Sequence, residues 1–290
     1  MIDGLAVVDK RAGWTSHDVV AVARGRLGER RVGHAGTLDP PATGVLLLGV
    51  GRVTRLLRFV GALPKRYLAE MVLGVETSTL DAEGEVVATH DMSSVSDEEV
   101  RAAAARFVGR IEQVPPMVSA VKVGGRRLHE LARQGVEVER APRPVDVHAL
   151  EIEATPEPLV YRLDVRCSSG TYVRTLAADI GNALGGGGHL RALRRTEIGA
   201  FRVEAGRDVE ELTITDLLPS RAAVDHLASV EVGDDLAAAI ANGAVLERAA
   251  LGVEGDGPWA VHGASGNLLA VYERRGDERV KPSVVLASNA

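Results

Sequence analysis

The sequence predicts a chain of mixed helices and strands, divided into a large domain and a small β-rich one. At 290 residues it is long enough for both, at roughly 100–200 residues per domain. Helix-like and strand-like patterns alternate over most of the chain, whereas strand-like pieces dominate its end. We place the boundary in the segment Pro219–Ala228 and expect domains over residues 1–224 and 225–290.

The first half of the chain contains elements of both kinds. Ser16 is a suitable N-cap for a helix with apolar residues at helical spacing, and Ser96-Asp97-Glu98-Glu99 is a capping box that opens another helix. Short apolar or alternating runs indicate strands. The expected elements are a strand over Leu5–Val8, a helix from Ser16 to Leu27, a turn-rich stretch from Gly33 to Gly44, a strand over Val45–Leu48, a helix over Val53–Val60, a strand over Tyr67–Leu73 and a helix from Ser96 to about Val108.

The second half continues in the same way and then changes character. The four glycines Gly185–Gly188 end a helix that starts near Thr171. After the boundary segment, one short helix leads into a run of strands. The expected elements are strands over Asp146–Ile152 and Tyr161–Val165, the helix Thr171–Leu184, a helix over Leu236–Ala241, and strands over Trp259–His262, Leu268–Glu273 and Val280–Leu286.

The composition is that of a soluble globular protein, with 46% hydrophobic and 26% charged residues. No apolar run approaches the roughly 20 residues that a membrane helix needs, and the start of the chain lacks the pattern of a signal peptide. The single cysteine, Cys167, excludes an internal disulfide and a multi-cysteine metal site. We therefore expect a cytoplasmic protein with no membrane segment.

The net charge of −6 hides an uneven distribution. Between Lys10 and Glu70 there are eleven Lys and Arg against four acids, a balance of +7, whereas Glu204–Ala290 contains fifteen acids and seven bases, a balance of −8. The local field, more than the total charge, attracts phosphate groups. The basic first part is compatible with binding a nucleic acid, although such a cluster is often only a solvated face.

The densest motif is Gly33-His34-Ala35-Gly36-Thr37-Leu38-Asp39-Pro40-Pro41-Ala42-Thr43-Gly44. Its glycines permit backbone conformations that other residues resist, and Pro40 restricts the preceding Asp39 to extended geometry. The motif thus places a carboxylate on a stiff loop before a buried strand. From residue types and spacing alone, an ordinary turn with a hydrogen-bonding His34 is the favoured interpretation.

The pattern Gly-His-x-Gly-x-Leu-Asp-Pro-x-Ala-Thr-Gly, followed by Val-Leu-Leu-Leu, resembles the catalytic motif of the TruB family of pseudouridine synthases. The resemblance implies that Asp39 is the nucleophile and that His34 contacts the substrate. Pro41 stands where the bacterial enzymes usually have leucine. Because this position only flanks the reactive carboxylate, we expect little consequence.

Further segments in the same order extend the resemblance over about residues 4–205. Val118 departs from the family, which usually has an aromatic residue there. The segments are Lys65-Arg66-Tyr67, Thr77–Gly84, Pro115–Lys122, Cys167–Leu176 and His189–Thr196. The resemblance implies that Tyr67 stacks on the target base and that Leu193 lines the pocket. It also implies roles for Asp81 in the second segment and for Arg174 in the fourth, which contains Tyr172 as well. Taken singly, the tyrosines could be core residues and Arg174 a surface charge.

The resemblance implies an α+β fold, in which a mixed, largely antiparallel sheet with packed helices precedes a small PUA-like β-barrel. It implies a thumb-like insertion at about residues 117–146 that orders on RNA. The implied reaction converts the uridine at position 55, in the T loop of tRNA, to pseudouridine. This isomerisation needs no cofactor and no metal. A flipped base would enter the pocket, where Arg174 keeps Asp39 ionised.

The substrate would be held through RNA shape and phosphate contacts. The candidates for phosphate contacts are Lys10, Arg11, Arg30, Arg31, Arg55, Lys65, Arg66 and Lys122. We expect a monomer without an obligatory protein partner. Two alternatives remain open: a non-catalytic RNA-binding or tRNA-folding protein on the same scaffold, and a nicotinamide-dependent enzyme. The second would use the partial fingerprint Gly49-Val50-Gly51-Arg52-Val53-Thr54, which lacks the third glycine.

Overall fold

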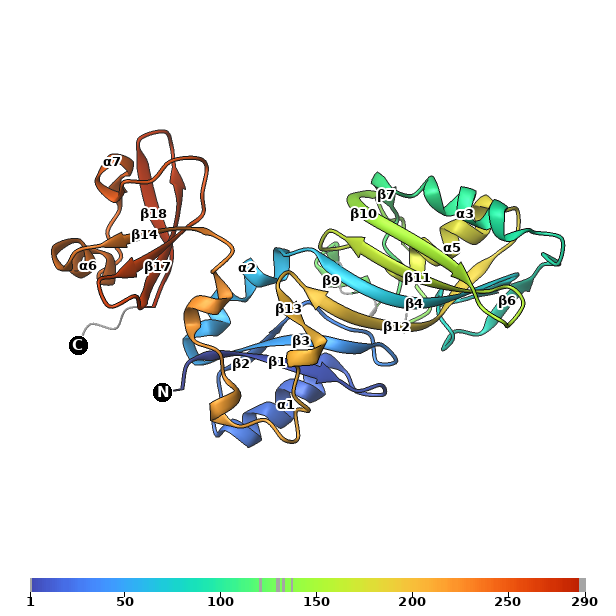
Figure 1. The fold of residues 1–290 in the computed structure, drawn as a ribbon, viewed down its shortest axis with the longest axis horizontal. Coiled ribbons are helices and arrows are strands. Elements are labelled where there is room, and N and C mark those ends of the chain that lie inside the picture. Colours follow the sequence, from blue (N-terminus) through green and yellow to red (C-terminus); the bar gives the residue numbers. More distant parts are fainter. Residues whose placement is uncertain (1, 120–121, 129–130, 132–133, 137, 287–290) are drawn as a thin grey trace.

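The computed structural model describes residues 2–119, 122–128, 131, 134–136 and 138–286, and these residues build two sheets of very different size (Figure 1). One sheet has nine strands and the other has five, and two small two-stranded hairpins accompany them. Figure 1 shows the five-stranded sheet at one end of the molecule, where its Val271 and Val284 share a buried cluster with Val53 and Leu56 of the larger part. The mixed α+β class that the sequence predicts is confirmed.

The nine-stranded sheet has the order β1-β3-β12-β4-β11-β10-β7, with β2 added to β3 and β13 added to β12. All of its pairings are antiparallel except that of β12 with β3. The strands are β1 (Gly4–Lys10), β2 (Val32–Ala35), β3 (Thr43–Val50), β4 (Lys65–Leu73), β7 (Gly109–Gln113), β10 (Arg143–Ala154), β11 (Val160–Cys167), β12 (Gly188–Ile198) and β13 (Phe201–Arg202).

Helices cover this sheet where apolar side chains need burial. Helix α1 packs Val19, Ala23 and Leu27 against alternate residues of β1 and β3, because one face of each element is apolar. Helices α3 and α5 bury a second cluster against β4 and β11, around Met71 and Leu176. The helices are α1 (Ser16–Leu27), a 3-10 turn η1 (Gly51–Leu56) that continues into α2 (Leu57–Ala62), α3 (Asp97–Ala105) and α5 (Val173–Ala183), and shorter 3-10 turns η2 (Val203–Ala205), η3 (Ile214–Asp216) and η4 (Ser220–Ala223) follow.

The five-stranded sheet, with the order β14-β16-β17-β18-β15, is the PUA-like unit. Its interior contains the buried Trp259 and Tyr272. Arg52 and Arg55 of η1 tie it to the larger sheet by donating to the carbonyls of Leu286 and Val285 at 2.5 and 2.7 Å. The elements are β14 (Ala228–Val232), α6 (Asp234–Ala241), β15 (Leu246–Glu247), α7 (Arg248–Leu251), β16 (Trp259–Gly263), β17 (Leu268–Arg275) and β18 (Arg279–Val285).

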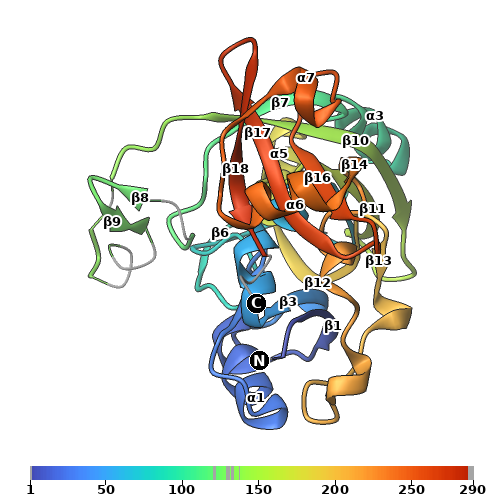
Figure 2. The same ribbon diagram turned by 90° about the vertical axis from the view of Figure 1, so that its left-hand side faces the viewer.

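Two hairpins project from the large sheet. The first pairs β5 (Val75–Thr77) with β6 (Val86–Thr89) and has Asp81 in its loop. The second pairs β8 (Lys122–Val123) with β9 (Arg126–Arg127). Figure 2 shows this second hairpin standing well away from the body of the molecule. It belongs to the connection between β7 and β10, where the sequence predicts an insertion, although residues 143–146 of that expected insertion already form part of β10.

Three sequence expectations need correction. The N-cap of α1 is Thr15, whose hydroxyl accepts from the amide of Asp18, so Ser16 is free for another contact. Helix α3 ends at Ala105 instead of Val108, because β7 begins at Gly109. Most importantly, the long strand β12 was not predicted, although it joins β3 to β4 at the centre of the sheet.

The close approach of β3 and β12 depends on Gly44, which has φ +104°. A Cβ atom there would lie 2.1 Å from the carbonyl oxygen of Arg195. We predict that Gly44→Ala lowers the free energy of unfolding by about 3 kcal/mol or more, since backbone must move. Urea denaturation measures this.

Gly185→Ala is the matched control, because Gly185 also has positive φ but an added Cβ would meet nothing within 4 Å. It should cost only the backbone strain of about 1–2 kcal/mol. Equal losses in the two variants would contradict the proposed clash.

Candidate active site

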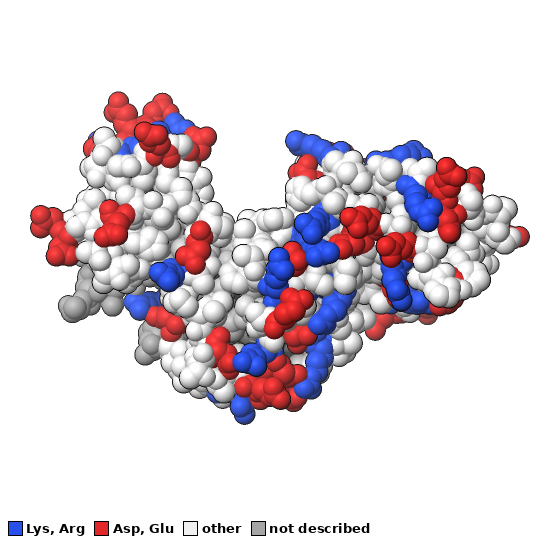
Figure 3. All heavy atoms as spheres, in the orientation of Figure 1, with Lys and Arg blue, Asp and Glu red and all other residues white. Residues whose placement is uncertain are grey.

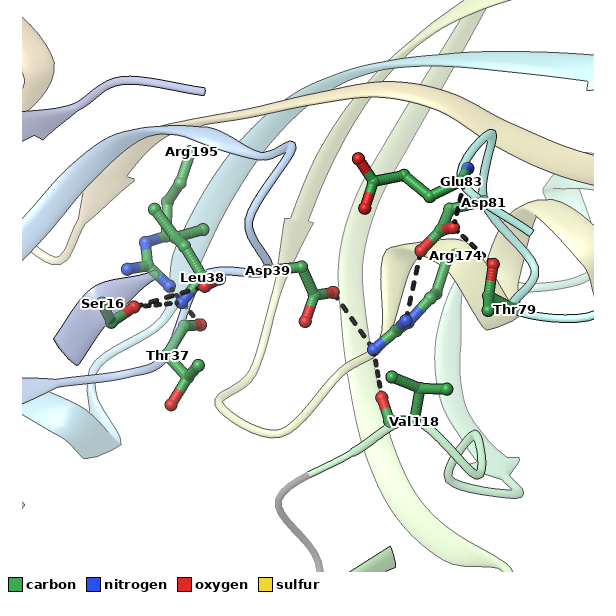
Figure 4. Close-up of polar contacts among 10 residues, drawn as sticks. All are labelled: Ser16, Thr37, Leu38, Asp39, Thr79, Asp81, Glu83, Val118, Arg174 and Arg195. Carbon is green, nitrogen blue, oxygen red and sulfur yellow. Dashed lines mark hydrogen bonds and ion pairs between the residues drawn. The ribbon is translucent and has the colours of Figure 1, made fainter. Parts of the chain in front are cut away.

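The loop between β2 and β3 carries Asp39 at the edge of a cavity. Figure 4 shows the carboxylate of Asp39 pointing toward Arg174. The Asp39 side chain is 39% exposed, whereas that of Arg174 is only 5% exposed. The carboxylate is therefore open on one side and faces a buried cation on the other.

Side chains from distant parts of the sequence fix this loop by its backbone. The hydroxyl of Ser16 accepts from the amide of Leu38 at 3.0 Å. The carbonyl of Pro40 accepts from the Lys10 ammonium at 3.0 Å and from the amide of Gly13 at 2.8 Å. The residues on both sides of Asp39 are thus held by hydrogen bonds, which leaves mainly the side-chain torsions of Asp39 free.

Arg174, in the first turn of α5, bridges two carboxylates. Its Nη2 lies 3.1 Å from Oδ2 of Asp39, and its Nη1 lies 3.2 Å from Oδ2 of Asp81. Nη2 also donates to the carbonyl of Val118 at 2.6 Å. Because one planar guanidinium forms ion pairs with both carboxylates, its position influences that of Asp39.

Asp81 is in turn held by its own loop. Its Oδ1 accepts from the hydroxyl of Thr79 at 2.5 Å and from the amide of Glu83 at 3.2 Å. The loop pairs with β12, since the amide of Ala82 donates to the carbonyl of Leu190 at 2.9 Å. Asp81 is therefore a fixed anchor for Arg174.

Opposing effects set the pKa of Asp39, and the net effect raises it above 3.8. Burial is the largest cause and raises the pKa, Arg174 lowers it, Asp81 raises it, and Lys10 lowers it. Without Arg174, the two effects that raise the pKa would act almost unopposed. The ion pair is consequently what favours the carboxylate form.

A cavity of about 290 Å³ opens beside Asp39. Its walls include Tyr67, Tyr172, Leu193 and Arg174, which come from β4, β12 and the start of α5. Tyr67 is only 8% exposed, and burial raises the pKa of its hydroxyl, so this group is a proton donor at neutral pH. The cavity brings together an acid residue, an aromatic ring and an apolar wall.

The structure does not place two of the predicted phosphate contacts at the surface. The Lys10 ammonium is buried and donates to the carbonyls of Arg11, Trp14 and Pro40. The Lys65 ammonium is buried and donates to the carbonyls of Gly61 and Leu63. Burial lowers the pKa of both lysines to about 8. Neither is placed to meet a phosphate on the surface.

The other predicted phosphate contacts differ in their surroundings. Arg30 and Arg31 are exposed, and within the described part of the chain neither forms an ion pair. Arg11 pairs with Asp208 and Glu210, and Arg66 pairs with Asp164 and Glu197. The side chain of Lys122 lies outside the described residues.

His34 lies in strand β2 instead of the loop that the sequence suggests. Its ring meets that of His17 edge-on, with centroids 5.3 Å apart, and its Nδ1 is buried without a partner among the described residues. Burial, with help from His17 and Arg195, lowers the pKa of His34 to about 4. The ring is neutral at physiological pH, and it is not part of the wall of the Asp39 cavity.

The basic surplus of the first part is partly neutralised on folding, because acids from later in the chain come to lie beside it. Arg11 meets Asp208, and Arg58 lies 3.6 Å from Glu273. Figure 3 shows Lys and Arg interleaved with Asp and Glu over the middle of one face.

The described residues form neither a metal-like cluster nor a membrane-spanning helix. Among them, no group of three His, Cys, Asp or Glu side chains is arranged to hold a metal ion. No helix formed by those residues is long and apolar enough to cross a membrane.

Sequence reasoning missed two residues that support the loop. Arg195, on β12, donates from Nη2 to the carbonyl of Gly36 at 2.9 Å, and Ser16 binds Leu38 as described above. Arg195 lies within the His189–Thr196 segment that carries the resemblance, but charged residues are rarely buried, so its residue type gives no reason to expect a buried supporting role.

Comparison with known proteins agrees with this geometry. The model of the TruB family pseudouridylate synthase N-terminal domain matches residues 24–173, and that of the tRNA pseudouridylate synthase B C-terminal domain matches residues 174–229. The chain belongs to the TruB family. Asp39, Asp81 and Tyr67 lie within the first match, and Arg174 begins the second.

Relatives match this TruB-family chain over almost its full length. A protein of Arthrobacter sp. (strain FB24), named tRNA pseudouridine synthase B, is 44% identical over 99% of this chain and 97% of its own. A protein of the same name from Rhodococcus jostii (strain RHA1) is 48% identical over 94% of this chain and 90% of its own. A solved Cbf5-Nop10-Gar1 complex contains a similar chain, with a TM-score of 0.77 and 26% identity, covering 98% of this chain and 85% of that one.

The raised pKa of Asp39 makes a prediction about stability. A carboxyl whose pKa is raised in the fold contributes stability when protonated, and this contribution is lost as pH rises through the folded pKa. We therefore expect the ionised form of Asp39 to destabilise the RNA-free protein. We expect Asp39→Asn to raise the midpoint of thermal unfolding at pH 7.

Asp81→Asn is the control, because Asp81 is a buried acceptor of several bonds. Its loss should lower the midpoint, since Arg174 would lose its anchor. If Asp39→Asn lowered the midpoint as much as Asp81→Asn, Asp39 would be a structural residue.

Proposed function

We propose that this chain is a tRNA pseudouridine(55) synthase that isomerises a uridine of the T loop, with Asp39 as its nucleophile. The observation that carries the proposal is the pairing of Asp39 with the buried Arg174 at the wall of a cavity that also contains Tyr67 and Leu193. The names of the relatives support the choice of tRNA, because they share nearly the whole length of this chain.

The reaction requires little more than these groups. The N1–C1′ bond of the uridine breaks, the uracil turns, and a C5–C1′ bond forms. The proton on C5 is lost to water and N1 gains a proton, so the reaction is an isomerisation without oxidation or group transfer. A carboxylate can act as covalent nucleophile in such chemistry, at either C1′ or C6.

The surrounding side chains have distinct roles in this proposal. Arg174 keeps Asp39 ionised and aimed, with Asp81 fixing Arg174. Tyr67 stacks on the uracil and supplies a protonated hydroxyl. Leu193 and Tyr172 close the cavity around the base and exclude water from the reactive intermediate. His34, outside the cavity, meets the RNA next to the flipped base.

The rest of the chain would hold the RNA. We propose a catalytic domain over residues 1–224, with an insertion at about 117–146 that orders on RNA, and a PUA-like domain over 225–290. Phosphates would be met by exposed arginines such as Arg30, Arg31 and Arg55. We propose a cytoplasmic monomer that acts on tRNA without an obligatory protein partner, cofactor or metal.

The direct test is tritium release from a T-arm RNA labelled at C5 of its uridines, since C5 loses its hydrogen only when the new bond forms. Wild type should release tritium without added cofactor. Asp39→Asn should release none, although it still binds the RNA. An RNA-binding wild type that releases no tritium would support a binding or tRNA-folding protein instead.

The exposed arginines give a second prediction. Arg30→Gln and Arg31→Gln should each weaken RNA binding and reduce the slope of log K against log salt by about 0.9, because each removes one phosphate contact. Arg11→Gln is the matched control, since Arg11 is already paired with Asp208 and Glu210. Binding isotherms at several salt concentrations measure the slopes. If the slope changes equally in all three variants, these contacts are wrongly assigned.

A further inference from the structure

Arg195 lies where strand β12 contacts both of its neighbours, β3 and β4. It lies on β12 directly opposite Tyr67 of β4 and beside Gly44 of β3. A bulge follows it, because the register of β12 against β4 shifts between Arg195 and Glu197. Bulges near active sites re-aim side chains. Here Leu193 and Arg195 both face the Asp39 cavity.

The guanidinium of Arg195 is buried, with 1% of the residue exposed. It donates to three backbone carbonyls: from Nε to Val45 at 2.8 Å, from Nη2 to Gly36 at 2.9 Å and from Nη1 to Thr37 at 3.5 Å. Across the described ranges, no carboxylate forms an ion pair with it. A buried cation without a counter-ion is costly, so a structural role alone would be served better by an uncharged residue.

The three carbonyls lie on both sides of Asp39 in the sequence. Val45 lies in β3, after the loop, whereas Gly36 and Thr37 lie before Asp39. One rigid fork thus ties the two ends of the loop together. Lysine could not do this, since its single nitrogen lacks the planar spread of donors.

We propose that Arg195 is a positioning residue for both Asp39 and Tyr67: it holds the loop of the nucleophile through its carbonyls and places a positive charge beside the tyrosine hydroxyl. The inference rests on the proposed function. No carboxylate among the described residues forms an ion pair with Arg195. A role beside Tyr67 would explain why a charged residue is kept there.

The surroundings of Tyr67 agree with this role. Burial is the largest influence on the pKa of its hydroxyl and raises it, whereas Arg195 lowers it. The same charge lowers the pKa values of Lys10, His34 and Lys65. Arg195 is therefore a source of positive potential that acts on Tyr67 and Lys65 in the cavity wall and on Lys10 and His34 outside it. A hydroxyl beside it gives up its proton more readily.

The test uses two variants that separate the two tasks. Arg195→Lys keeps the charge but loses the fork, so the single-turnover rate should fall by about 100-fold, the effect of misplacing a reactive group by about 1 Å. Arg195→Gln loses the charge and leaves no unpaired cation in the core. It should also move the alkaline limb of the rate–pH profile upward, since Tyr67 then holds its proton more tightly.

Arg194→Lys is the matched control. Arg194 is the neighbouring residue, but it pairs with Asp9 and binds the hydroxyl of Thr43. It should keep the wild-type rate and profile. RNA affinity should stay within about threefold of wild type in all variants, because a positioning residue affects the reaction more than binding.

Each result decides the proposal. Unchanged rates in both Arg195 variants would overturn it, and so would a loss of rate in Arg195→Gln without the alkaline shift. If Arg195→Lys does not fold, the Gln profile alone decides. The proposed function fails separately, since wild type itself would then release no tritium from the labelled RNA.

Discussion

The ion pair between Arg174 and Asp39 is the interaction on which the site depends. Burial and the nearby Asp81 both favour the protonated form of Asp39, and Arg174 is the main group that opposes them. Asp81 serves as an anchor because its own loop and β12 hold it. A carboxylate nucleophile must be ionised and correctly oriented. The guanidinium of Arg174 favours both conditions.

The rest of the sheet supports that arrangement. Strand β12 brings Leu193 and Arg195 to the cavity and also pairs with the Asp81 loop. Gly44 lets β3 approach β12, because a Cβ atom at this position would clash with the backbone of Arg195. This clash explains why the motif ends in glycine. The ammonium groups of Lys10 and Lys65, which the sequence predicts as phosphate contacts, instead donate to carbonyl oxygens inside the protein. Lys10 donates to the carbonyl of Pro40. Rigidity of the loop thus comes from buried cations that bind carbonyl oxygens.

Sequence reasoning found the elements with strong local signals, such as the capping box at Ser96 and the apolar strand β3. It missed β12, because Arg191, Arg194 and Arg195 interrupt its apolar pattern and two bulges break its alternation. The resemblance selected Asp39 and Arg174, and the structure brings them within 3.1 Å. It could not show that Lys10 and Arg195 are buried, since they bind carbonyls contributed by distant segments. Lys65 is also buried, but the carbonyls that it binds, Gly61 and Leu63, are close to it in the sequence.

The most direct test of this account is the pKa of Asp39 itself, measured by NMR on protein with labelled aspartate carboxyl carbons, with Asp39→Asn to assign the signal. The account predicts that the pKa of Asp39 in the wild type is raised above its ordinary value of 3.8. In Arg174→Gln, which removes the cation but keeps hydrogen-bond donors, the pKa should rise further. An Asp39 pKa that is unchanged by loss of Arg174 would contradict the central claim.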